Sequence, residues 1–230
     1  MGKRINIKSI QSVDIDNNFK MTLPERDTES ICWFKTAVLN YNTANILLNN
    51  KIVCHALFFM QQCVECVVKG ILIENHIVAI GEIKKWNHSP ENAFSELYRS
   101  FESQSEELFT KIKEKINNEH GLQSKLKITI SIINHYFKVY EDSLNMTHSK
   151  IEPSVYLHLY VDVAIISLSV LLNCMQQNTR YPDIETYRLP TMVYDESEIV
   201  VEYTREILKM INCILNYYCP LNIATLIPTH

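Results

Sequence analysis

The feature that most constrains this chain is a helical spacing of apolar residues that returns in one segment after another. Apolar side chains recur at steps of three and four residues, which places them on one face of an α-helix. Sandwiches and barrels need glycine at many tight turns, whereas this chain has 4 glycines among 230 residues. The sequence therefore predicts an all-α protein. The stripes that carry this prediction include Trp33, Ala37, Tyr41, Ala44 and Leu48; Leu126, Ile130, Ile133, Phe137, Tyr140 and Leu144; and Val200, Tyr203, Ile207, Met210, Ile214 and Tyr217.

The helical segments are expected to form one domain over residues 27–219, between a polar arm at 1–26 and a tail at 220–230. An antiparallel helical bundle packs such stripes against one another. Residues from about 90 to 147 are predicted to form an enlarged helical hairpin within it, because both of its segments carry apolar seams suited to antiparallel packing.

The charge and cysteine content point to a cytoplasmic protein that does not rely on a basic surface. The formal net charge is -4, so any binding to nucleic acid would need a local basic patch. The 7 cysteines have no disulfide-framework spacing, and the first residues lack the apolar core of a secretion signal. His158 and Asp162 interrupt the longest apolar run, 155–175, which favours a buried core helix over a membrane span.

A polar stripe inside an otherwise apolar helix, expected over about 52–75, is the most informative local feature. Gln62, Glu65 and Lys69 follow one another at steps of three and four, and Gln61 lies four residues before Glu65. A buried charge without a partner costs several kcal/mol, so these groups are expected to pair with each other or with a neighbouring helix. Two interpretations stay open: a buried ion-pair network that fixes helix register, or a stripe that faces a ligand or a partner.

The segment QQCVECVVKGILIEN resembles the signature of the HEPN superfamily, of the form Gln-Gln-x-x-Glu-x-x-x-Lys-x-x-Leu. The segment beginning at Trp33 resembles the family's first helix, WNHSPENAFSEL resembles a His-containing segment before a later helix, and 179–183 matches a stretch before the last helix. The resemblance covers about residues 27–218.

This resemblance implies an antiparallel helical bundle that often forms a homodimer. It also implies a component of a toxin–antitoxin or phage-defence system, which in many members pairs with a small nucleotidyltransferase. Some members are metal-independent ribonucleases, so nucleotide or RNA is a further expected partner. No cofactor, metal ligand or membrane partner is expected from the sequence.

The ribonuclease branch of the family uses an Arg followed, after four to six residues, by a His, and no Arg in these 230 residues has a His at that spacing. No catalytic residue is therefore assigned, although an RNA-cleaving toxin with a rearranged site remains the alternative. His88 and Arg180 match family landmarks, and we expect them to approach one another and bind a phosphate. The competing interpretation is that Arg180 pairs with Asp183 or Glu65 and organises a loop. The candidate ligand- or partner-facing site is Gln61, Gln62, Glu65, Lys69, His88, Arg180 and Asp183.

Overall fold

The computed structural model of the protein describes residues 28–78, 83, 95, 103–145, 151–174 and 197–218. Within these ranges the chain forms long α-helices and no strand, which confirms the predicted all-α bundle. The helices are α1 (Thr28–Asn49), α2 (Val53–Glu74), α5 (Ser103–Asn117), α6 (Leu122–Leu144), α7 (Pro153–Asn173) and α10 (Glu198–Tyr218).

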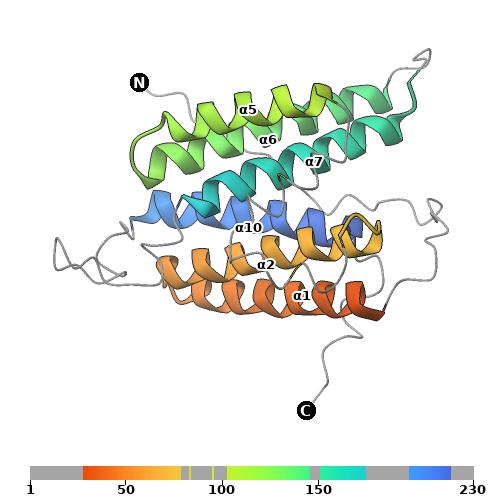
Figure 1. The fold of residues 1–230 in the computed structure, drawn as a ribbon. Helices are drawn as coiled ribbons and strands as arrows, with labels where there is room; N and C mark the ends of the chain where they lie inside the picture. Colours follow the sequence, from red (N-terminus) through yellow and green to blue (C-terminus); the bar gives the residue numbers. More distant parts are fainter. Residues whose placement is uncertain are drawn as a thin grey trace, which may run out of the picture.

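Helix α10 holds the bundle together from its middle. It lies between α1 and α2 on one side and the group of α5, α6 and α7 on the other (Figure 1), and it packs against α1, α2, α6 and α7. Its apolar side chains alternate at helical spacing, so one helix can present buried residues to both groups. Helix α10 therefore adds to the direct contact that α2 and α7 make between the two halves of the bundle.

The turn between α1 and α2 explains how a chain with few glycines makes a sharp reversal. The amide of Ile52 donates to the Leu47 carbonyl at 2.9 Å, and the amide of Lys51 donates to the Leu48 carbonyl at 3.0 Å. This pattern is the Schellman motif, whose penultimate residue is in the left-handed region and is usually glycine. Here Lys51 occupies it, with φ at 60°. The motif folds α2 directly back along α1.

A close approach of α1 and α2 depends on the single glycine within α2. A Cβ atom at Gly70 would lie 2.9 Å from the Phe34 ring, which is closer than real Cβ atoms come. The Phe34 ring is itself only 3% exposed, and it stacks on Tyr218 of α10 with the ring centroids 6.4 Å apart. The absence of a side chain at Gly70 thus sets the spacing of three helices.

Helices α2 and α7 are long and apolar enough to cross a membrane by length and hydropathy alone. Most of that apolar stretch is buried within the bundle, 83% of it in α2 and 67% in α7. The protein core therefore accounts for their apolar character, as we expected for residues 155–175.

The predicted hairpin is present in part, with a different main contact. Helices α5 and α6 run side by side (Figure 1), and Lys125 Nζ donates to the Ile116 carbonyl at 2.9 Å across their turn. However, the buried face of α6 packs more extensively against α7 than against α5. The sequence named only α5 as the neighbour of the α6 seam, because helical spacing identifies a buried face and not every helix that covers it.

We expect Gly70→Ala to lower the free energy of unfolding by about 1–3 kcal/mol, since the added methyl group overpacks a filled site. Alanine would otherwise favour the helix by up to about 1 kcal/mol. Combining Gly70→Ala with Phe34→Leu should therefore abolish this penalty relative to Phe34→Leu alone. Urea titrations of the four proteins measure both effects, and an equal penalty in both backgrounds would contradict the close approach.

Candidate functional site

The polar stripe of α2 forms a compact hydrogen-bonded group. Lys69 Nζ donates to Glu65 Oε1 at 2.6 Å, and Gln62 Nε2 donates to Glu65 Oε2 at 3.3 Å. Glu65 and Lys69 are only 3% and 5% exposed, whereas Gln62 is half-buried. The predicted pairing of the two charges is confirmed, and it places a complete ion pair inside the bundle.

Helix α1 covers this group and supplies further contacts to it. Lys69 Nζ lies 5.0 Å from the centroid of the Trp33 ring, within the range of a cation–π interaction. One turn earlier on α2, Asn40 of α1 donates to Cys66 Sγ at 3.9 Å. Helix α1 thus covers the Glu65 and Lys69 charges of α2. A ligand would reach these charges only past the half-buried Gln62 or by displacing α1.

The Cys66 thiol beside the ion pair is unsuited to nucleophilic or metal chemistry. Burial, together with the neighbouring Glu65 charge, raises the pKa of Cys66 to about 12. A thiol acts as a nucleophile or a metal ligand through its thiolate, which is scarce at neutral pH under these conditions. Cys66 therefore acts as a small packing residue beside the polar group.

The structure places part of the predicted site and leaves the other part outside the described residues. Gln61 is buried in α2 at 1% exposure, on the same helix as Gln62, Glu65 and Lys69. The remaining candidates, His88, Arg180 and Asp183, fall outside the described ranges, so their predicted approach to one another stays a prediction.

A second polar group, which the sequence analysis did not assign to a site, lies between α7 and α10. The Tyr217 hydroxyl is hydrogen-bonded to the His158 ring, and the two rings meet edge to face with centroids 5.5 Å apart. Asp162 lies one turn after His158 on α7 and acts electrostatically on Tyr217. The signal for this group was present in the sequence, because His158 and Asp162 are the polar interruptions of the apolar run and are four residues apart.

Burial shifts the titration of all three side chains toward their neutral forms. It raises the pKa of Asp162 from its ordinary value of 3.8 to about 6 and lowers the pKa of His158 below 6.5. Burial, together with the Asp162 charge, raises the pKa of Tyr217 to about 12. At neutral pH the group therefore offers an uncharged imidazole, a protonated phenol and one carboxylate. Such a set can accept, hold and return a proton.

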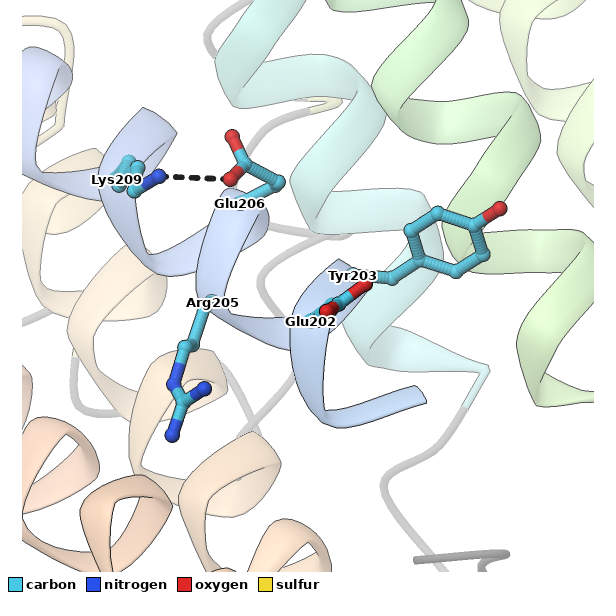
Figure 2. Close-up of a pocket in the computed structure, with 5 residues that line it drawn as sticks. All are labelled: Glu202, Tyr203, Arg205, Glu206 and Lys209. Atoms are coloured by element: carbon cyan, nitrogen blue, oxygen red, sulfur yellow. Dashed lines mark hydrogen bonds and ion pairs between the residues drawn. The ribbon is translucent and has the colours of Figure 1, made fainter. Parts of the chain in front are cut away.

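A surface hollow on α10 is the third candidate. Figure 2 shows it lined by side chains of this helix alone, and the Lys209 ammonium is paired with the Glu206 carboxylate at 2.7 Å. This pairing neutralises one of the two basic groups, so the hollow is not an anion site of the kind a phosphate needs. The lining residues are Glu202, Tyr203, Arg205, Glu206 and Lys209.

Comparison with known families identifies the class of this helical bundle. The model of the HEPN domain family matches residues 32–214, which include most of α1, all of α2 with its polar stripe, and most of α10. The chain therefore belongs to the HEPN domain family. A search of the curated proteins and a search of the solved structures found no match. Membership of the family indicates a nucleotide- or RNA-related role of the toxin or defence type.

We expect Glu65→Gln to lower the free energy of unfolding by about 3–5 kcal/mol, because it leaves the buried Lys69 ammonium without its counter-charge. Replacing both residues by methionine should recover most of this loss. Glu107→Gln is the matched control, since Glu107 and Lys111 form a pair of the same spacing with side chains 72% and 64% exposed. Thermal and urea unfolding should show no change in that control. Equal effects at the two sites would contradict the buried pair.

We expect Asp162→Asn to stabilise the protein at neutral pH and not at acidic pH. Between about pH 4 and pH 6 the unfolded chain releases the Asp162 proton while the native chain retains it, so stability falls as pH rises. Asparagine removes this cost, which is about 3 kcal/mol at pH 7.5 because each pKa unit corresponds to roughly 1.4 kcal/mol. Urea unfolding at pH 4.5 and 7.5 measures it, with exposed Asp142→Asn as control. A gain independent of pH would contradict the shifted carboxyl.

Proposed function

We propose that the protein is a cytoplasmic, homodimeric interaction component of a toxin–antitoxin or phage-defence system, and that it acts by binding a nucleotidyltransferase. The observation that carries the proposal is the closed state of the family's polar motif. Glu65 and Lys69 neutralise one another at 2.6 Å, beneath α1, with 3% and 5% of their surface exposed. Groups held in this way fix the packing of a scaffold and do not contact a substrate.

The partner proposal is tested by assembly. We expect affinity purification from the native cell to yield a nucleotidyltransferase, identified by mass spectrometry. The two purified proteins should then form a complex of fixed stoichiometry by light scattering after size exclusion. Failure of the purified nucleotidyltransferase to bind at micromolar concentrations would overturn the partner proposal. Nucleotides are the second class of partner, and a rise in melting temperature with ATP or GTP measures their binding.

The alternative function is RNA cleavage at a rearranged site, and the group between α7 and α10 is the observation that favours it. Cleavage by attack of a ribose 2′-hydroxyl needs a base that is unprotonated near neutral pH and an acid that protonates the leaving oxygen. The exposed His158 imidazole has a lowered pKa and is hydrogen-bonded to Tyr217, beside the Asp162 carboxyl. The group thus contains the residue types for both roles.

Incubation of the purified protein with labelled RNA separates the two functions. We expect no cleavage by the wild type if the interaction proposal is right. Cleavage that is lost in His158→Ala and Tyr217→Phe would establish the group between α7 and α10 as the active site. Cleavage that persists in those variants and is lost in His88→Ala and Arg180→Ala would instead assign the activity to the family landmarks. Either form of cleavage would overturn the interaction proposal.

A further inference from the structure

Helix α1 carries a second stripe, of mixed apolar and polar residues, on the side that faces away from the bundle. Leu39 and Ile46 are 59% and 62% exposed, and Cys32 is exposed as well. In Figure 1, α1 forms one edge of the bundle, with α2 and α10 on its inner side. We call this stripe the outer seam; its residues are Cys32, Thr36, Leu39, Thr43, Ile46 and Asn50.

The polar residues of the outer seam are turned inward on their own helix. The Thr36 hydroxyl donates to the Cys32 carbonyl at 2.9 Å, and the Thr43 hydroxyl donates to the Leu39 carbonyl at 3.0 Å. The Asn50 amide donates to the Ile46 carbonyl at 2.8 Å. Because each donor is already bonded to the helix backbone, the outer seam can be covered without the loss of these hydrogen bonds.

The spacing of the outer seam is that of a helix that packs against another helix along its whole length. Its six residues follow one another at steps of four, three, four, three and four, which is the heptad pattern of coiled-coil packing. The core stripe of Phe34, Tyr41 and Leu48 keeps the same seven-residue spacing on the opposite side of α1. Helix α1 is thus built to pack on two sides, of which the bundle covers one.

We propose that the outer seam of α1 pairs antiparallel with the outer seam of a second copy of this chain, around a two-fold axis that crosses α1 at the level of Tyr41. The positions of the seam residues along the helix are symmetric about this level. Antiparallel pairing therefore places Leu39 beside Thr43 of the second copy, Thr36 beside Ile46 and Cys32 beside Asn50. Every seam residue then meets another seam residue, which is the self-complementarity that a two-fold interface requires.

The charges along α1 favour the antiparallel orientation over the parallel one. Glu29 lies in the first turn of α1, and Lys51 directly follows the last turn. Antiparallel pairing brings the acidic end of each helix to the basic end of the other, whereas parallel pairing brings like ends together. The residues that flank the seam on one side are Lys35, Asn42 and Asn49, so Lys35 faces an amide and not a second cation.

This inference rests on the proposed homodimer and names its surface, so the experiment must separate the two. Light scattering of the wild type should give twice the chain mass of 26.8 kDa, and Leu39→Arg combined with Ile46→Arg should give the single mass. Leu144→Arg is the matched control, because Leu144 is 55% exposed on α6 and should leave the dimer intact. A dimer that survives the double substitution would overturn the surface alone, and a monomeric wild type would overturn the homodimer as well.

A disulfide trap tests the register without disturbing the seam. We expect Asn50→Cys to cross-link to the native Cys32 of the second copy under mild oxidation, and to double the mass on a non-reducing gel. The control, Asn50→Cys with Cys32→Ser, should lose this cross-link. Leu39→Cys that cross-links to itself, together with an Asn50→Cys that does not reach Cys32, would overturn the antiparallel register.

Discussion

The ion pair between Glu65 and Lys69 is the constraint on which the arrangement of the bundle depends. A carboxylate and an ammonium that are both removed from water require each other and a cover that excludes solvent. Helix α1 provides the cover through Trp33, and the absence of a side chain at Gly70 lets α1 come close enough to do so. The rotation of α2 is thereby fixed, because any other rotation would expose the two charges. A buried pair of this kind specifies one packing more than it adds stability.

The polar group of α2 and the polar group between α7 and α10 differ in how far a ligand could reach their side chains. The α2 group is neutral as a whole, enclosed, and hydrogen-bonded through both carboxylate oxygens. The group of His158, Asp162 and Tyr217 is partly open to solvent, and the carboxyl carries no hydrogen bond or ion pair from the described part of the chain. Chemistry with a ligand requires a partly open group such as that of His158, Asp162 and Tyr217. Fixing the position of one helix against another requires an enclosed group such as that of α2. This enclosure of the α2 group is what supports the proposed scaffold role of the family motif.

The sequence predicted what is local along the chain and missed what depends on packing between distant helices. The pairing of Glu65 with Lys69 could be predicted because residues four apart always meet on a helix. The meeting of His158 with Tyr217 could not, since it depends on how α7 and α10 are rotated against each other. The more extensive contact of α6 with α7 was missed for the same reason. The outer seam was overlooked because Thr36 and Thr43 count as polar residues in the sequence. In the structure their hydroxyls are hydrogen-bonded to backbone carbonyls of α1.

The central position of α10 has a consequence for how the chain folds as it is synthesised. Helices α1 and α2 are joined by a tight turn and can pair as soon as both have left the ribosome, as can α6 and α7. Residues 198–218 emerge after all of these, yet α10 packs against α1, α2, α6 and α7 and so supplies much of the contact between the two halves. Until then, the apolar faces that α10 covers remain open to water and to other chains. The nascent protein therefore needs protection at these faces until α10 docks on them and completes the core.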